Sequence, residues 1–506
     1  MGGVPPASTI SLGRRRAITA GLLLGMSLGA LEATVVGTAM PTVIATLGGL
    51  SHYSWVFSAY LLTSTASVPI WGRLSDLYGR RRMYLTGIAV FLIGSVVSGA
   101  ATSMWVLIAA RALQGLGAGA IIPLSMTIVG ELYALSERAR TQALFSGVWG
   151  VASVAGPLVG GSITDAFSWR WVFYLNIPFG LLAAAVIASA YPPAPRNDRI
   201  SVDWAGASLL FTGISALLIA LGGDTGMGLW WFAGAVVLLA GFARAERRAT
   251  DPMLPLVLLK NPLIARTLVV VFLVGMALFA AIAFVPLFVQ GVMGATATQA
   301  GQVLTPLFLG WVVMSIVGAR MTVRLGYRRL ASAGGLLMTL GFIGLALADA
   351  GASRNMVMAD GLLIGSGMGL SMLSLLLAVQ HGVDRSYLGL ATSLNQFSRS
   401  VGAAVGVAAM GAVLTRGLSG ISIPGGIESL AATGTMLTGT MRVQFAAALH
   451  QVFVACAVLS GASLVATAFL PAVDFSRGVS AGAGEQLLAA EMTNLEPDDE
   501  PIGVRE

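Results

Sequence analysis

The sequence predicts an all-α integral membrane protein, and three observations lead to this fold class. Only 10% of the 506 residues are charged, while 56% are hydrophobic. A soluble domain is about 25% charged, so this chain is too apolar to cover a surface that faces water. Apolar runs of about 20 residues, the length of a helix that crosses a bilayer, recur from end to end. The 64 glycines also fit, because small residues let membrane helices approach closely.

A hydropathy reading predicts about fourteen transmembrane helices. They lie near residues 17–39, 54–71, 83–101, 104–126, 141–162, 171–190, 203–222, 229–243, 267–290, 300–319, 330–348, 355–379, 392–415 and 446–470. The eighth, in the stretch LWWFAGAVVLLAGFA, is the shortest. An even number of spans places both chain ends on one side of the membrane.

The arginines predict which side this is. Most of the 29 basic residues fall in the two terminal segments and in the loops on their side. The opposite side has only Arg170, Arg354, Arg416 and Arg442. Positive loops stay in the cytoplasm, so we expect a multi-pass protein of the cell inner membrane with both termini cytoplasmic. The net charge of +7 is therefore a topology signal and does not indicate nucleic acid.

The first span contains a glutamate, Glu32, in the stretch LGALEATVVGTAMP. An ionisable group deep in a bilayer costs about 2.5–3.5 kcal/mol, so a compensating function is expected. A basic cluster precedes this span, as in a signal peptide, but Glu32 and the lack of a small-x-small cleavage site favour a retained helix. Arg111 and Arg399 also fall inside predicted spans.

Composition argues against two other classes of protein. The single cysteine, Cys456, provides neither a disulfide framework nor a thiol metal site, and no metal ligands or catalytic residues are predicted. The three histidines, His52, His381 and His450, map to separate places, which argues against a membrane enzyme. The lysine of an ATP-binding loop follows a glycine-rich run, whereas Lys260 follows LVLL, so an ATP-driven pump is excluded.

An internal repeat links the two halves of the chain. The loop GRLSDLYGRRR after the second span matches ARMTVRLGYRR after the tenth when Gly79 is aligned with Gly326. Asp76 has no acidic counterpart, because Val323 stands at its position. Parallel repeats build many secondary transporters and place the substrate site at the repeat interface.

Four stretches resemble the major facilitator superfamily and, within it, the fourteen-span drug:proton antiporter branch. The first is GRLSDLYGRRR, with Gly72, Asp76, Gly79, Arg80 and Arg81, which is similar to the signature loop of the superfamily. We expect Asp76 to cap the following helix, where the helix dipole favours an anion. The resemblance implies that this loop takes part in conformational gating.

The second stretch, RALQGLGAGA, resembles the fourth-span motif and contains Arg111 and Gln114. At 1.5 Å per residue, Arg111 and Glu32 lie at similar depths, about 8–10 Å from the outer ends of their spans, so the two side chains can pair. The resemblance implies that Glu32 and Arg111 couple transport to protons, although the family usually has aspartate at the first position. We expect Glu32 to face the central site.

The third stretch, GVWGVASVAGPLVGG, resembles the antiporter signature through Gly156, Pro157, Gly160 and Gly161. Glycine permits close helix contact and proline removes a backbone hydrogen bond, so the segment can bend. The resemblance implies that it packs on a second-half helix and closes one side of the cavity. The fourth stretch, WRWVFYLNIPFG, resembles the sixth-span entry and supports the family without a mechanism.

Further residues are candidates for lining a substrate cavity. Arg399 lies within a span, and an arginine there needs a partner or a wet cavity. The other candidates, for which packing or an interfacial position is the alternative, are Gln114, Asn395, Asp360, Trp55, Tyr60, Trp149, Phe284 and Gln290.

The resemblance implies a major facilitator fold of two six-helix bundles plus two linker helices. The corresponding division is a cytoplasmic segment at 1–16, bundles at 17–190 and 261–471, a linker with two extra spans at 191–260, and a disordered cytoplasmic tail at 472–506.

The implied function is a secondary active, proton-coupled antiporter that exports lipophilic drugs or toxic compounds by alternating access. The implied transporter is driven by the proton gradient and uses no cofactor. We expect a monomer to which adaptor proteins can bind. A dedicated exporter of a lipid or secondary metabolite is the alternative on the same fold, and a symport-driven importer fits the Gly-Pro segment less well.

Overall fold

The computed structural model describes the membrane-embedded part of the chain. The described residues are 11–133, 135–193, 204–222, 227–248, 256–349, 351–381, 383, 388–419 and 440–471. The predicted tail, most of the N-terminal segment and the long loop before the last helix lie outside this range. All regular elements in the described part are helices.

The first half of the chain forms seven of these helices. They are α1 (Leu12–Leu47), α2 (Tyr53–Tyr78), α3 (Arg80–Gly99), α4 (Met104–Leu132), α5 (Leu135–Ala166), α6 (Arg170–Tyr174) and α7 (Asn176–Ala190). The middle of the chain gives α8 (Trp204–Gly222) and α9 (Gly228–Glu246). The second half gives α10 (Pro262–Gly291), α11 (Ala297–Leu325), α12 (Tyr327–Leu347), α13 (Arg354–His381), α14 (Leu388–Ser419) and α16 (Thr440–Ala468).

The all-α membrane architecture predicted from the sequence is confirmed. By length and composition, 12 stretches of the described chain are apolar enough to cross a membrane, with α6 and α7 forming one of them. Helix α8 is a shorter apolar helix, and the 26-residue α2 lies outside the twelve. Several serines and threonines, together with Arg73 and Asp76, make α2 more polar. The number of fourteen crossings therefore stays a prediction.

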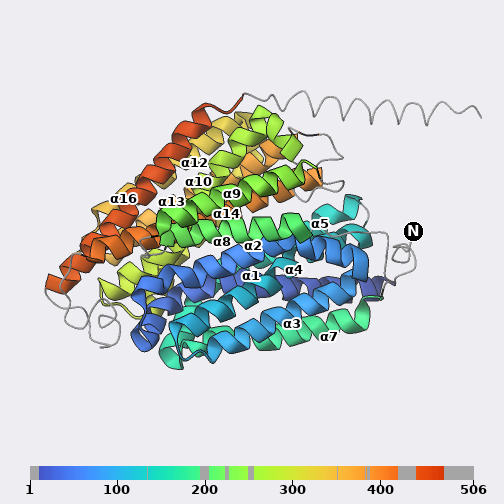
Figure 1. Cartoon of the computed structure of the whole chain (residues 1–506), viewed down its shortest axis with the longest axis horizontal. Coiled ribbons are helices and arrows are strands. Elements are labelled where there is room, and N and C mark those ends of the chain that lie inside the picture. The colour runs from blue at the N-terminus through green and yellow to red at the C-terminus, as the bar shows by residue number, and fades with distance from the viewer. Residues whose placement is uncertain are drawn as a thin grey trace, which may run out of the picture.

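The helices pack as two groups, which we call the N-terminal and C-terminal halves. Helices α1–α7 pack on one another, as do α10–α16, and the halves meet where α5 packs on α11 and α2 packs on α14. Helix α8 lies against α2 and α14 together, and α9 packs on the outside of α8 (Figure 1). The α8–α9 pair therefore covers one of the two seams between the halves.

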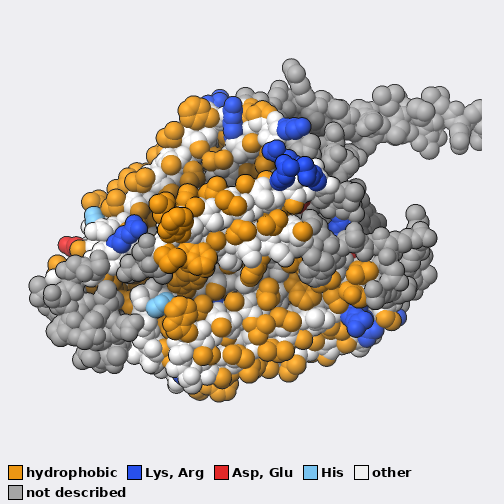
Figure 2. Space-filling model, viewed as in Figure 1, with side chains coloured by type: hydrophobic (Ala, Val, Ile, Leu, Met, Phe, Trp, Pro, Cys, Tyr) orange, Lys and Arg blue, Asp and Glu red, His pale blue; other side chains and the backbone are white. Residues whose placement is uncertain are grey.

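Both described chain ends lie at the same end of the helix bundle, which we call the terminal end. Arg14, near the start of α1, donates a hydrogen bond to the carbonyl of Ala190 at the end of α7 (2.6 Å). In the other half, Arg266 of α10 donates to the carbonyl of Phe469 after α16 (2.7 Å). Basic side chains gather toward this end on the face that Figure 2 shows. We call the opposite end, where α1 leads into α2, the distal end.

The repeat indicated by the sequence extends to the helix packing. A Cβ atom on Gly117 of α4 would overlap the backbone of Gly87 in α3. Likewise, a Cβ atom on Gly367 of α13 would overlap the backbone of Gly334 in α12. Equivalent helix pairs in the two halves are therefore held at backbone contact by equivalent glycines, as small residues allow in membranes.

The seam between α5 and α11 widens from the distal end toward the terminal end. Near the distal end, a Cβ atom on Gly161 or on Gly301 would overlap the backbone of the facing helix. Farther along, a Cβ atom on Gly150 would lie 3.5 Å from Val312, and one on Gly147 would meet nothing within 4 Å. The two helices thus touch at the distal end and diverge toward the terminal end.

Hydrogen bonds between the halves also lie toward the distal end in the described part of the chain. The Gln290 side chain of α10 donates to the carbonyl of Thr38 in α1 (2.8 Å). The Ser58 hydroxyl of α2 donates to the carbonyl of Ala404 in α14 (3.2 Å). Together with the widening seam, these contacts describe a conformation that is closed at the distal end.

The glycine contacts generate a stability prediction. Gly117→Ala should lower the melting temperature of the detergent-purified protein, because overpacking costs about 1–3 kcal/mol. Gly367→Ala should have a similar effect in the other half. Gly234→Ala is the control, since a Cβ atom there meets nothing within 4 Å. If all three variants melt at the same temperature, the close packing described above is wrong.

Candidate functional site

A buried ion pair lies at the centre of the N-terminal half. Glu32 of α1 and Arg111 of α4 are each 2% exposed, and Nη1 of Arg111 forms a salt bridge with Oε1 of Glu32. The contact predicted from their similar depths is therefore present. Taking two charges out of water is expensive, so the remaining polar atoms of such a pair need hydrogen-bond partners.

Two amide side chains bind the other oxygen of the Glu32 carboxylate. Nε2 of Gln114 in α4 donates to Oε2 at 2.9 Å, and Nδ2 of Asn176 in α7 donates to the same atom at 2.7 Å. Both amides also lie within hydrogen-bond distance of the Ser95 hydroxyl in α3. Four helices thus converge on one carboxylate, and both of its oxygens accept hydrogen bonds.

The guanidinium of Arg111 is held as firmly as the carboxylate. Its Nη1 donates to Gln114 at 2.6 Å, and its Nε donates to the carbonyl of Val56 in α2 at 3.3 Å. The guanidinium carbon lies 4.2 Å from the centre of the Tyr60 ring, a cation–π contact. Tyr60, predicted to line a cavity, therefore stabilises the cation of the pair.

The carboxylate points into its own bundle, contrary to the expectation that it faces the central site. Glu32 reaches α3, α4 and α7, whereas Gly37, farther along α1, packs on Ile282 of α10 in the other half. At 3.6 residues per turn, these two positions lie on different sides of α1. The donors Arg111 and Asn176 hold the side chain there, so it is walled off in this conformation.

Asn176 and Ser95 are functional candidates that the sequence analysis missed. Asn176 begins α7, directly after the short helix α6. Pro178, two residues later, cannot donate a backbone hydrogen bond and its ring crowds the carbonyl of Tyr174, which explains the break at Leu175. The signal in the sequence was an asparagine inside an apolar span, two residues before a helix-breaking proline.

The signature loop between α2 and α3 is joined to α4. Gly79 has φ of 90°, a backbone conformation that favours glycine, and it begins α3 without a side-chain cap. The prediction that Asp76 caps α3 is therefore wrong. Asp76 instead pairs with Arg80, and Nε of Arg80 also binds Glu131 at the end of α4 (2.9 Å). After the glycine turn, Arg80 therefore pairs with two carboxylates, one from α2 and one from α4.

Arginines at the terminal end bind the last carbonyls of two equivalent helices. Arg81 donates to the carbonyl of Ala188 in α7, and Arg328 donates to that of Ala468 in α16. Cations are favourable at helix C-termini, where carbonyls lack partners. Gly72 lies near this end, and a Cβ atom on it would meet nothing within 4 Å. The gating role of the loop stays a prediction.

The antiporter-like segment of α5 packs closely on α1. A Cβ atom on Gly156 would overlap the side chain of Thr34, and one on Gly160 would lie 2.7 Å from both Val35 and Thr38. The same segment also faces the C-terminal half, as its resemblance implies. It therefore lies between α1, which carries Glu32, and α11.

On its other side, this segment binds the start of α11. The Pro157 carbonyl lies against Gly301, and the carboxylate of Asp165 accepts hydrogen bonds from the backbone N–H groups of Ala297 (3.1 Å) and Thr298 (2.8 Å). A carboxylate is favourable at a helix N-terminus because backbone donors there lack partners. Asp165 thus links the halves at the distal end.

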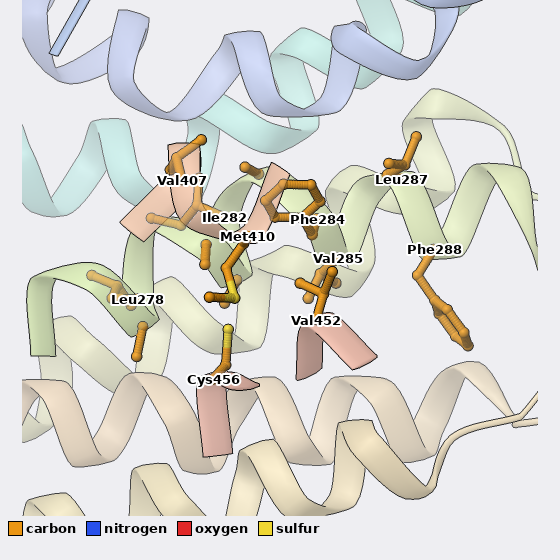
Figure 3. Close-up of a cluster of buried hydrophobic side chains, with 14 of the residues drawn as sticks. Leu278, Ile282, Phe284, Val285, Leu287, Phe288, Val407, Met410, Val452 and Cys456 are labelled. Atoms are coloured by element: carbon orange, nitrogen blue, oxygen red, sulfur yellow. The ribbon is translucent and has the colours of Figure 1, made fainter. Parts of the chain in front are cut away.

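The predicted aromatic lining residues have different environments. Phe284 is fully buried in the distal hydrophobic core, where it lies among Leu287, Val285 and Met410 (Figure 3). Trp55 and Trp149 are half-buried. The structure thus gives Phe284 a packing environment, because α10 is enclosed by helices of both halves at this level.

The predicted polar lining residues do not form one cluster. Gln290 joins the halves through Thr38, as described above, and Asp360 of α13 faces Gly344 of α12. Oδ2 of Asp360 has no hydrogen-bond partner although the residue is 8% exposed. Asn395 and Arg399 lie on α14, away from the ion pair.

Comparison with known proteins fits this architecture. Residues 22–407 match the family model described as Major Facilitator Superfamily. The multidrug transporter protein MdtP of Bacillus subtilis is 38% identical over 408 residues, which is 79% of this chain and 75% of that protein. Multidrug resistance protein 3 of the same organism is 36% identical over 407 residues, 79% of each chain.

Solved structures share the fold at low sequence identity. A bacterial homologue of the human lysosomal transporter Spinster, inward-facing and occupied, has a TM-score of 0.67 at 15% identity and covers 91% of this chain and 97% of its own. A D-xylose–proton symporter has a TM-score of 0.62 at 15% identity, with 90% and 98% covered. The matching family model and the multidrug relatives, found on a chain of apolar helices in two similar halves, show that this protein belongs to the major facilitator superfamily, whose members are transporters and not enzymes.

Proposed function

We propose that this protein is a proton-coupled antiporter that exports lipophilic compounds across the cytoplasmic membrane. It would cross the membrane fourteen times, with two six-helix halves, two linker helices and both termini in the cytoplasm. The names of its relatives, multidrug transporter and efflux pump, support export of lipophilic compounds. The proton gradient supplies the driving force, and no cofactor is involved.

The buried pair of Glu32 and Arg111 is the observation that supports proton coupling. In the sealed pair the guanidinium of Arg111 neutralises the carboxylate of Glu32, and a proton can take over this role when the two side chains separate. Separation of Arg111 from Glu32 would favour proton uptake, and their approach would favour release. The sealed pair described above represents the state after release.

The arrangement of the halves supports alternating access. The halves touch at the distal end and diverge at the terminal end, which corresponds to a transporter open to the cytoplasm. Release of the proton on that side would coincide with binding of the compound to be exported. Because α1 lies between the ion pair and the α5–α11 seam, movement at the seam can reach Glu32 through Gly156 and Gly160.

A dedicated exporter of one lipid or secondary metabolite remains the second candidate. A relative named acurin A biosynthesis cluster MFS-type transporter, from Aspergillus aculeatus, is 32% identical over 399 residues, 76% of this chain and 72% of that protein. Proteoliposomes with an imposed pH gradient separate the two candidates. Uptake of several unrelated lipophilic dyes, cationic and anionic, supports a multidrug exporter, and uptake of lipids alone supports the dedicated one.

Glu32→Gln should abolish proton-driven transport in these proteoliposomes, because the side chain then cannot exchange a proton. The variant also leaves the Arg111 charge unpaired, so its melting temperature should fall, and transport is compared between equal amounts of folded, reconstituted protein. Dye accumulation and resistance in a pump-deficient host should show the same loss. Asp349→Asn, which removes an exposed carboxylate, is the control. Full, uncoupler-sensitive efflux by Glu32→Gln would contradict the assignment.

Arg111→Met should destabilise the protein strongly, since an unpaired buried charge costs about 3–5 kcal/mol. The double variant Glu32→Gln with Arg111→Met should recover much of this loss, because neither charge remains. Thermal unfolding in detergent measures both. Arg354→Met, at an exposed arginine, controls for the substitution itself. A double variant no more stable than Arg111→Met would show that the pair is not coupled.

Asp165→Asn should loosen the distal contact, because the α11 N–H groups lose a charged acceptor. The test uses Thr38→Cys in a Cys456→Ser background and a membrane-impermeant thiol reagent. Thr38 is buried at the distal seam, so labelling reports opening. The rate should rise several-fold with Asp165→Asn and stay constant with Asp349→Asn. Equal labelling rates in the two variants would show that Asp165 does not hold the distal end closed.

A further inference from the structure

Arg399 is a charged group in the middle of a membrane helix with no acidic partner. It lies well inside α14, and its Nη2 donates to Oε1 of Gln396, a neutral amide on the same helix, at 2.8 Å. Within the described residues, the ion pairs are those of Arg111 and Arg80, and no carboxylate lies within ion-pair distance of Arg399. An intramembrane arginine of this kind marks a substrate or ion pathway more often than a packing position.

The packing of α14 shows that Arg399 does not face lipid. One face of the helix, which includes Phe397, Val401 and Val405, packs into an apolar cluster that also contains residues of α8 and α10. A second face packs on α10, where Cβ atoms on Gly402 and Gly406 would overlap the backbone. The first face is thus turned toward the linker helices, and the second is turned toward the C-terminal half.

A third face of α14 contacts the N-terminal half at the distal end. Ala404 accepts the hydrogen bond from Ser58 of α2, and Gly411 packs on Ser54. At 3.6 residues per turn, Arg399 lies at the edge of the α10-facing side, where Gly275 of α10 packs on its backbone, on the flank that is turned toward α2. It lies toward the terminal end from Ala404, where the halves diverge, and it is half-buried beside the exposed Gln396. The guanidinium thus faces the space between the halves.

Among the described residues of the facing half, no carboxylate lies within ion-pair distance of this charge. Glu32 is bound to Arg111, Gln114 and Asn176 inside its own bundle. In the C-terminal half, the Asp360 carboxylate lies against Gly344 of α12. A second donor lies one turn before Arg399, on the adjoining side of α14 that packs on α10. Nδ2 of Asn395 has no hydrogen-bond partner among the described residues, and the residue is 6% exposed.

We propose that Arg399, together with Asn395, binds an anionic group of the transported compound. The planar guanidinium matches the geometry of a carboxylate, sulfonate or phosphate through two parallel hydrogen bonds. The substrates are accordingly lipophilic molecules that carry a negative charge. This assignment rests on the proposed export function and adds the charge class of its substrate.

The experiment compares three dansyl amides that differ only in one group: a sulfonate, a methyl group or a trimethylammonium group. Binding to the full-length protein in detergent is measured by fluorescence for the wild type, Arg399→Gln, Arg399→Lys and the exposed control Arg354→Gln. Wild type should bind the sulfonate most tightly. Arg399→Gln should weaken that binding about ten- to a hundredfold, as expected for loss of a charge-assisted hydrogen bond, with little effect on the neutral compound.

Arg399→Lys should retain part of the preference, and Arg354→Gln should retain all of it. Equal affinity of wild type for the three compounds, or an equal loss of all three in Arg399→Gln, would overturn the proposal. A fluorescent short-chain phosphatidylglycerol forms a second arm. If it binds in an Arg399-dependent way and the sulfonate does not, the anion comes from a lipid headgroup and the anion-binding role stands.

Transport of the same compounds separates this proposal from the proposed function. Arg399-dependent sulfonate binding without transport under a pH gradient would contradict proton-driven export and leave the anion site intact. The opposite result is proton-driven transport of the trimethylammonium compound, unchanged in Arg399→Gln and with no preference for the sulfonate. It would contradict the anion site and leave proton-driven export intact.

Discussion

The buried charge pair between α1 and α4 imposes the main constraint on this structure. Two full charges in a low-dielectric interior are tolerated only when their remaining donors and acceptors are satisfied. Helix α7 brings Asn176 to the carboxylate of Glu32, Ser95 of α3 accepts a hydrogen bond from the same amide, and α2 places Tyr60 over Arg111. Most of the N-terminal half is arranged around this requirement.

Close helix packing transmits this constraint to the rest of the molecule. Helix α5 touches α1 through small residues on one side and α11 on the other, and α1 itself packs on α10, so the helix that carries Glu32 is in direct contact with the opposite half. The C-terminal half repeats the glycine contacts of the N-terminal half, since Gly367 matches Gly117 in packing. Among its described residues, Asp360 forms no ion pair like that of Glu32. The two halves therefore share a scaffold and differ in their charges.

Much of the fold could be predicted from the sequence, because hydropathy and basic loops specify helices and their direction. The contact of Glu32 with Arg111 followed from depth along each helix. The direction of the Glu32 side chain could not be predicted in this way. It depends on how α1 is rotated about its axis, and Asn176 of α7 binds the carboxylate from across the bundle. The expected cap by Asp76 fails because its carboxylate pairs with Arg80, four residues later, and Arg80 is also bound by Glu131 of α4, a contact that the local sequence does not show. Phe284 was predicted to line a cavity. Its burial depends on helices of both halves that pack around α10, which the sequence around Phe284 does not show.

The central claim is that Glu32 gains and loses a proton during transport although it is sealed in the conformation described here. Infrared difference spectroscopy of the reconstituted protein measures this directly, through the carbonyl band of a protonated carboxyl group. The account predicts a band that changes with pH within the range of active transport and is missing in Glu32→Gln. A Glu32 carboxylate that stays ionised throughout that range, with and without a transported compound, would contradict it.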